Sequence, residues 1–157
     1  MRKTDPSRYT QSQMERSIRG YVDRLNNENP GSVCQLLAPE FISCDLEKKE
    51  LVLRYPIREW MRNPGGVMHG GAIASAMDTT MGVQIFYWAD DQMPPTINML
   101  ANFQRPVPLG SMLYVRARVT YAGRTMVYAT SEAWVDDEPD RLLVTASGVY
   151  HVPSRKG

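Results

Sequence analysis

The sequence predicts an α+β domain in which a curved antiparallel sheet wraps around one long apolar helix. A segment that begins near Gly70 and ends near Trp88 is almost entirely apolar and carries one charge, Asp78. Several other segments alternate apolar and polar residues, as half-buried antiparallel strands do. One of these, residues 126–135, has a face of mostly small residues that can receive a bulky helix. A sheet that curls around the helix buries both surfaces economically.

Length and composition favour one globular domain. A chain of 157 residues can bury a substantial core without disulfides, and Cys34 and Cys44 are expected to be reduced thiols. The formal charge of +1, without a long basic run, argues against a dedicated nucleic-acid surface. The first residues lack the apolar core of a signal peptide, and the apolar run 72–89 is short for a bilayer. We therefore expect a cytoplasmic protein that does not enter a membrane.

The first half of the chain is expected to contain an N-terminal helix and a hairpin. After a loose tail, residues 11–27 place apolar side chains at helical spacing, and the Asn, Pro and Gly residues of 26–31 end that helix. Residues 33–37 are expected to form another helical turn. Residues 41–46 and 51–57 flank a charged turn and predict a β-hairpin.

The second half is organised around the apolar helix and the strands that follow it. The helix is expected to begin at Gly70-Gly71 and to be buried on every side. Alternating patterns then predict strands over residues 96–104, 112–121, 126–135 and 142–152. In the first of these strands, Ile97, Met99, Ala101 and Phe103 alternate with polar residues.

Two features of the apolar helix suggest chemistry. Its first N–H groups have no partner within the helix, so Gly70 and Gly71 let a substrate oxygen approach these donors closely. Asp78 is a carboxylate in an otherwise apolar segment. Because an unpaired carboxylate in apolar surroundings is costly to ionise, such a residue usually has a bound partner or a role in a reaction. Gly70 and Asp78 lie roughly 12 Å apart along the helix and about 80° apart around it. A site that uses both therefore needs a second copy of the chain.

These motifs carry a resemblance to a known family. The pattern Asn-x-x-Gly-x-x-His-Gly-Gly, followed by an Asp on the helix, resembles that of the hotdog-fold acyl-CoA thioesterases of the phenylacetate-degradation type. The residues of this pattern are Asn63, Gly66, His69, Gly70, Gly71 and Asp78. The resemblance continues through residues 96–99, 103–106, Gly110 and 123–125, and covers roughly residues 40 to 152.

The resemblance implies an assembly as well as a fold. Residues 39–153 would form the hotdog domain, a curved antiparallel sheet around a long central helix, and residues 1–38 an additional tail and helix packed on it. Family members pair edge to edge into homodimers with shared active sites, and often into homotetramers. No metal and no cofactor is implied, because coenzyme A enters as part of the substrate.

The resemblance also assigns catalytic roles. Asp78 would be the nucleophile or the general base, and the Gly70 N–H the oxyanion donor. Asn63 and His69 would orient the thioester carbonyl or the attacking water, while His69 also fits a purely supporting role at the start of the helix. Thr96 stands where many members have a serine that positions water. Direct attack by water and an acyl-Asp78 anhydride both remain open.

Further residues are candidates for substrate binding. Gly71 and Met77 border the expected site, and Arg105, Arg124 and the pair Arg155-Lys156 are candidate partners for the phosphates of coenzyme A. Large apolar residues of the helix fit either an acyl pocket or ordinary core packing. They are Met77, Met81, Phe86, Tyr87 and Trp88.

Two other functions occur on this fold. The first is hydration or dehydration of acyl thioesters, but the chain lacks the Asp-x-Asn-x-x-His and Gly-His-Phe-Pro patterns of those enzymes. The second is a non-catalytic acyl-CoA sensor fused to a DNA-binding domain, for which one helix before residue 30 is too little. Thioester hydrolysis is therefore the leading expectation.

Overall fold

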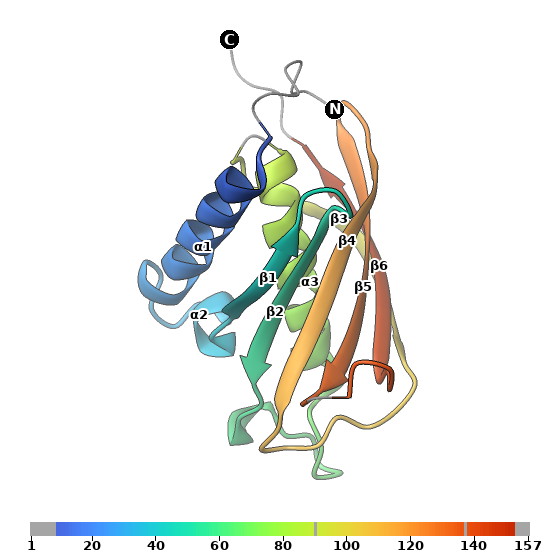
Figure 1. Cartoon of the computed structure of the whole chain (residues 1–157). Helices are drawn as coiled ribbons and strands as arrows, with labels where there is room; N and C mark the ends of the chain where they lie inside the picture. The colour runs from blue at the N-terminus through green and yellow to red at the C-terminus, as the bar shows by residue number, and fades with distance from the viewer. Residues whose placement is uncertain (1–8, 90, 137, 153–157) are drawn as a thin grey trace.

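A six-stranded antiparallel sheet curves around the helix α3 (Figure 1). The computed structural model describes residues 9–89, 91–136 and 138–152. The helices are α1 (Gln11–Asn27), α2 (Val33–Leu37), the short 3-10 helix η2 (Glu59–Met61) and α3 (Gly70–Trp88). The strands are β1 (Glu40–Asp45), β2 (Glu50–Pro56), β3 (Thr96–Phe103), β4 (Met112–Ala122), β5 (Met126–Val135) and β6 (Val144–His151). This arrangement confirms the predicted α+β class.

The strands are ordered β1-β2-β4-β5-β6-β3 in the sheet. β4 pairs with both β2 and β5 over most of its length, so the longest strands form the middle. β3 leaves the end of α3 and joins the far edge, where Thr96 lies opposite Tyr150 and a register shift follows between Thr96 and Asn98. The first residue of β3 and the end of β6 therefore lie together.

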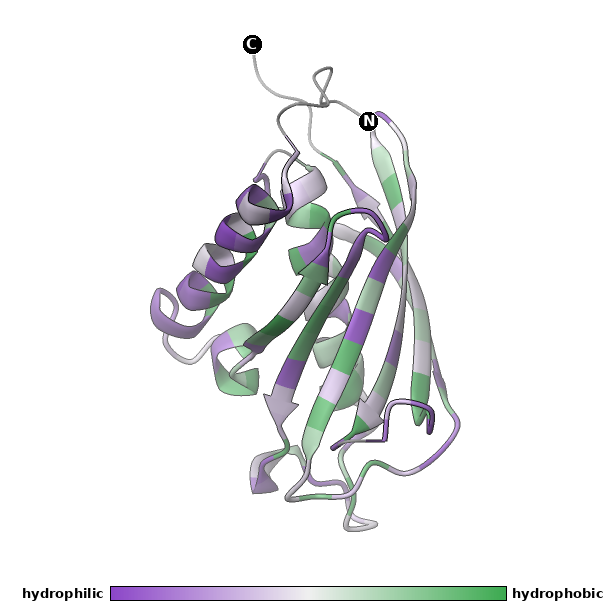
Figure 2. Ribbon diagram, in the orientation of Figure 1, coloured by the Kyte–Doolittle hydropathy of each residue, from purple (hydrophilic) through white to green (hydrophobic). Residues whose placement is uncertain are grey.

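The core lies between the sheet and α3. Alternation places Leu113, Val115 and Ala117 of β4 inward, and each is fully buried. The small residues Ala129 and Ala133 of β5 are buried as well, which confirms that this face receives the helix. Figure 2 shows the same alternation of polar and apolar residues along the strands.

The expectation that α3 is buried on every side is wrong. The helix buries Ile73, Met77, Met81 and Ile85, but a strip of small and polar residues along it is half-buried or exposed. The strip consists of Gly71, Ala74, Ser75, Asp78, Thr79 and Gly82. The sheet covers one side of the helix and α1 and α2 cover another, so this strip remains uncovered in one chain. Most of its residues are apolar or small, which is why the sequence pattern did not separate them from the core.

α1 packs against β1 and α3 with its apolar side and presents polar residues outward (Figure 2). Its start is fixed by a capping box, in which Thr10 and Gln13 exchange side-chain to backbone hydrogen bonds. Met14 and Ile18 are fully buried, and the Tyr21 ring stacks on Phe86 of α3 with centroids 3.9 Å apart. α1 thus shares its core with the sheet. The boundary between residues 38 and 39 remains a prediction.

β3 is the least protected strand of the sheet. Ile97, Leu100 and Phe103 are 52%, 64% and 52% exposed, so the alternation in this strand does not separate a buried from a solvated face. An edge strand with apolar side chains on both faces is a surface on which another strand can pair.

No helix in the described part of the chain is both long enough and apolar enough to cross a membrane.

The other predicted elements are confirmed to within a few residues. α1 and α2 have the predicted bounds, and the hairpin β1–β2 lies one residue earlier than expected. The last strand is shorter than predicted, because it begins at Val144 instead of residue 142. Leu143 still aligns with the sheet through its N–H, which donates to Ala133 O at 2.8 Å.

Candidate active site

The loop before α3 is held closed by Asn63. Its N–H donates to Val67 O at 2.9 Å, its carbonyl accepts from the Gly66 N–H, and its Oδ1 accepts from the Val67 N–H at 3.3 Å. Gly66 has φ +81°, a conformation that glycine adopts without strain. Asn63 therefore shapes the turn that delivers the chain to the helix start.

His69 caps the first turn of α3. Its Nδ1 accepts a hydrogen bond from the Gly71 N–H at 2.8 Å, so this nitrogen carries no proton and a neutral ring is protonated on Nε2. A Cβ on Gly71 would lie 3.0 Å from Nδ1, so glycine permits this close contact. The Gly71 N–H is thereby occupied. Among the described residues, no hydrogen bond uses the N–H of Gly70.

The Gly70 end of the helix borders a hollow of about 280 Å³. Asn63, Gly70 and Arg105 all line it, together with Phe103, whose ring lies 3.5 Å from where a Gly70 Cβ would be. Arg105 is fixed by a hydrogen bond from Nη1 to Leu142 O. A positive guanidinium and the positive end of the helix dipole thus face one hollow, which suits an anionic or oxyanionic group.

Asp78 receives two hydroxyl donors on one oxygen. Thr96 Oγ1 donates to Asp78 Oδ1 at 2.9 Å, and the Tyr150 hydroxyl donates to the same oxygen at 2.8 Å. The Tyr150 hydroxyl also lies 3.4 Å from the Asp78 carbonyl oxygen. Within the described residues, no hydrogen bond occupies Oδ2. The carboxylate is therefore fixed by one oxygen and has the other available.

Tyr150 is a permanent donor in this arrangement. Burial raises the pKa of the Tyr150 phenol strongly, and the charge of Asp78 and the hydrogen bond to it raise that pKa further. The side chain is fully buried, and its ring lies over Gly148, where a Cβ would come within 2.8 Å of the ring. Tyr150 was not among the site residues predicted from the sequence. The only signal was its inward-facing position in the alternating pattern of β6, because the pairing of β6 with β3 is not visible in the sequence.

The structure separates the candidates into different places. Asp78 and Thr96 line a hollow of about 230 Å³, while Asn63, Gly70 and Arg105 line the hollow at the helix start. His69 and Gly71 line a third, of about 310 Å³, beside Trp60. A single chain thus brings the candidates into groups that do not share one cavity.

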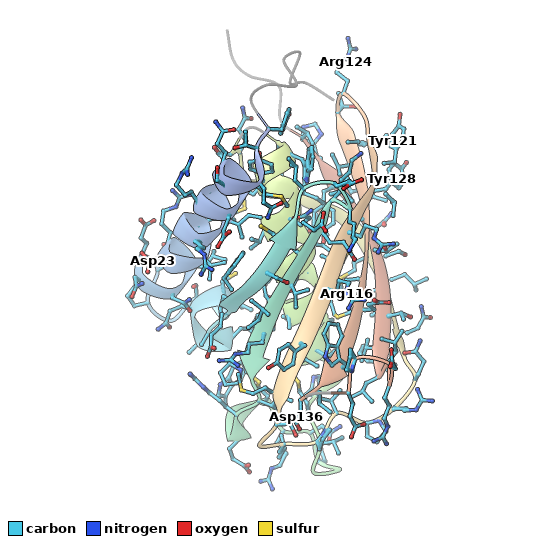
Figure 3. All side chains as sticks on the ribbon, in the orientation of Figure 1. Asp23, Arg116, Tyr121, Arg124, Tyr128 and Asp136 are labelled. Carbon is cyan, nitrogen blue, oxygen red and sulfur yellow. The ribbon has the colours of Figure 1, made fainter. Side chains whose placement is uncertain are left out.

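Two candidates for substrate binding lie apart from all three hollows. The Met77 side chain is fully buried against the sheet, with its sulfur 3.9 Å from Ser131 Oγ. Arg124 stands exposed at the turn between β4 and β5 (Figure 3). Arg155 and Lys156 lie outside the described residues. Among the described residues, no group of three His, Cys, Asp or Glu side chains is placed to hold a metal ion.

A helix wrapped by an antiparallel sheet, with an acid at mid-helix and a capped glycine pair at its start, defines a hotdog-fold protein. The thioesterase superfamily model matches residues 65–141. A protein of Saccharolobus solfataricus, provisionally named an esterase, is 30% identical over 108 residues, which are 69% of this chain and 75% of the relative. The chain belongs to the thioesterase superfamily and is a thioester hydrolase.

Two further comparisons agree with this assignment. A phenylacetic acid degradation-related protein from Ralstonia eutropha, provisionally described as a thioesterase, superposes with a TM-score of 0.72 at 27% identity, covering 84% of this chain and 99% of that structure. An acyl-coenzyme A thioesterase of Xenopus laevis is 28% identical over 98 residues, 62% of this chain. The matched part spans 42% of that longer relative. The predicted resemblance to the phenylacetate-degradation type is confirmed.

Proposed function

We propose that this enzyme hydrolyses acyl-CoA thioesters to the free acid and coenzyme A, with Asp78 as the catalytic carboxylate. The supporting observation is that two hydroxyl groups hold Oδ1 of Asp78 and leave Oδ2 available. An oriented carboxylate with one available oxygen is suited to accept a proton from water. It is equally suited to attack the carbonyl and form an anhydride.

The oxyanion donor in this proposal is the Gly70 N–H at the start of α3. It is a backbone donor without a partner among the described residues and lies at the positive end of a helix of 19 residues. Developing negative charge on the thioester oxygen is stabilised by such a donor. His69 holds the first turn through Gly71, and Asn63 holds the loop, so both would act by supporting Gly70.

The active site in this proposal is shared by two copies of the chain. Asp78 and Gly70 line different hollows, so one copy would supply Asp78 and the other Gly70. The exposed apolar residues of the edge strand β3 support pairing along this strand, next to Thr96 and the Gly70 hollow. A pair of such dimers, the tetramer suggested by the resemblance, remains a prediction.

The reaction is balanced by one water molecule. In direct attack, water adds its oxygen to the thioester carbonyl, the carbon–sulfur bond breaks, and the thiolate of coenzyme A takes up the proton that Asp78 had accepted. In the anhydride route, Asp78 adds to the carbonyl and the thiolate leaves, and water then hydrolyses the anhydride, which releases the acid and restores Asp78. Arg105 would bind a phosphate of coenzyme A in this proposal, which is supported by its position in the lining of the Gly70 hollow and by its hydrogen bond to Leu142 O. Arg124 lies at the tip of a hairpin and would need the second copy to approach substrate.

The test is the release of free thiol from acyl-CoA substrates by the wild type and Asp78→Asn. The substitution keeps the size of the side chain and its acceptor for Thr96 and Tyr150, but removes the base. We expect kcat to fall roughly 10²-fold or more. Asp23→Asn, an exposed aspartate on α1 (Figure 3), is the matched control and should retain the wild-type rate.

Three results would redirect the proposal. Equal rates for wild type and Asp78→Asn would make Asp78 structural. Hydration of an enoyl-CoA without thiol release would favour a hydratase, and tight acyl-CoA binding without turnover, unchanged by Asp78→Asn, would favour a sensor.

A further inference from the structure

We infer that the hollow beside Asp78 binds the acyl group, and that Gly82 together with Tyr21 and Leu25 of α1 limits its size. This inference rests on the proposed function and adds to it the class of substrate. The hollow has a volume of about 230 Å³ and lies between α1, α3 and the segment before β3. Because Asp78 and Thr96 line the same hollow, a carbonyl held at Asp78 would direct its acyl chain there.

The missing side chain at Gly82 leaves room beside Asp78. Gly82 lies one turn after Asp78 on the same face of α3, and both line the hollow. A glycine inside a helix destabilises it relative to alanine. Nothing nearby requires glycine at this position, since an added Cβ would meet no atom within 4 Å. The absence of a side chain at Gly82 therefore leaves space in the hollow and serves no contact in the core.

The wall contributed by α1 is the second observation. Tyr21 and Leu25 are 7% and 9% exposed and form the side of the hollow opposite α3. The Tyr21 ring is fixed by stacking on Phe86, and its hydroxyl donates to Met93 Sδ at 3.1 Å. This contact joins α1 to the segment before β3, and Met93 also lines the hollow. Both α1 residues lie outside the stretch 65–141 matched by the family model.

The volume and the lining define the class of acyl group. Away from Asp78 the hollow is bordered by Leu25, Val83 and Pro94, which favour an uncharged apolar group. Its volume of about 230 Å³ is below the roughly 300–1,000 Å³ of pockets that enclose drug-sized ligands. This size fits a single-ring arylacyl group or an aliphatic chain of medium length. A palmitoyl chain would extend beyond the hollow.

The experiment measures kcat/KM of the full chain for acetyl-, hexanoyl-, phenylacetyl- and palmitoyl-CoA. The variants are Gly82→Leu, which fills the hollow, and Gly20→Leu, the same change at an exposed helical glycine that also has open space around it. Met93→Ala, at a lining residue that is 61% exposed, enlarges the hollow without removing a core side chain. Asp78→Asn is assayed in parallel, and thermal unfolding shows which variants fold.

We expect the wild type to favour hexanoyl- and phenylacetyl-CoA over palmitoyl-CoA. Gly82→Leu should lower kcat/KM for these two at least about tenfold more than for acetyl-CoA, and Gly20→Leu should not. Met93→Ala should raise kcat/KM for palmitoyl-CoA relative to the shorter substrates. If Gly82→Leu does not fold, this change in chain-length preference alone tests whether the hollow binds the acyl group. Preference between phenylacetyl and hexanoyl separates an aryl from an alkyl substrate.

The failures of the two proposals are distinguishable. If Asp78→Asn abolishes turnover but Gly82→Leu and Met93→Ala keep the wild-type chain-length profile, the acyl hollow is elsewhere and the thioesterase assignment stands. If the wild type releases no thiol from any of the four substrates, both proposals are overturned.

Discussion

Thr96 and Tyr150 lie opposite each other across strands β3 and β6 and donate their hydroxyl hydrogens to the same oxygen, Oδ1 of Asp78. The two strands are far apart in the sequence and adjacent in the sheet. Their pairing orients a carboxylate on a third element, α3. The geometry of the proposed catalytic group therefore depends on the sheet as much as on the helix.

Tyr150→Phe tests this dependence. The substitution removes one donor to the Asp78 carboxylate and keeps the ring, so we expect kcat to fall about tenfold with little change in KM. Thermal unfolding of the variant shows how much stability is lost with the donor. A merely structural tyrosine would lower the stability but leave kcat unchanged at temperatures where the variant is folded.

His69 can be assigned to capping or catalysis with two substitutions. His69→Ala removes the acceptor for the Gly71 N–H and should lower the free energy of unfolding by about 1 kcal/mol. His69→Asn restores a side-chain acceptor at the start of the helix, so we expect it to recover both stability and activity. If His69→Asn is stable but inactive in the thiol-release assay, the imidazole takes part in the reaction itself.

The proposed dimer can be tested at Leu100. Leu100→Glu places a charge on the exposed apolar edge strand, so light scattering should show a monomer, and the thiol-release rate should fall with it. Tyr121→Glu is the matched control, because Tyr121 is 61% exposed at the far end of β4 (Figure 3). A wild-type protein that is monodisperse, monomeric and fully active would contradict the shared site.

The buried tyrosines predict loss of stability in alkali. Burial raises the pKa of Tyr55 and of Tyr150 well above that of an unfolded tyrosine, about 10. The folded state then keeps protons that the unfolded state releases, so the stabilisation is present below about pH 10 and is lost as the pH rises further. Urea unfolding between about pH 9 and 11.5 should show this fall.

Tyr55→Phe is the control for the alkaline effect. It removes one of the two phenols, so the decline in the free energy of unfolding with pH should become shallower. Thr80 loses its contact with the Tyr55 hydroxyl but still donates to Ala76 O at 2.9 Å, so no buried donor is left without an acceptor. An unchanged slope would show that Tyr55 ionises equally in both states.

Much of the fold could be predicted from the sequence because its signals are local. The spacing of Met14, Ile18 and Tyr21, ended by an Asn and Gly-rich turn, was sufficient for α1. Alternation was sufficient for β4 and β5. The uncovered strip on α3 was not predicted, because small residues such as Ala74 and Gly82 have the same pattern on a buried and on an exposed face.

From the residue pattern alone, the candidate site could be predicted only within one continuous stretch, and Thr96 was added by the family resemblance. The glycine pair, the capping His69 and Asp78 belong to one continuous stretch, so their relation follows from helix geometry. The Tyr150 donor and the α1 wall at Tyr21 and Leu25 depend on which elements meet in space. Periodicity identifies each element and its buried side, but it does not identify the neighbour.

The register shift between Thr96 and Asn98 links the accuracy of folding to activity. Successive residues of a strand point to opposite faces, so a slip of β3 by one position would replace the Thr96 hydroxyl at Asp78 with an apolar Ile97 side chain. Such a molecule would keep its sheet, its core and its far-UV spectrum. Enzymatic turnover would therefore count the correctly registered molecules in a refolded sample, which a spectroscopic measure of secondary structure cannot do.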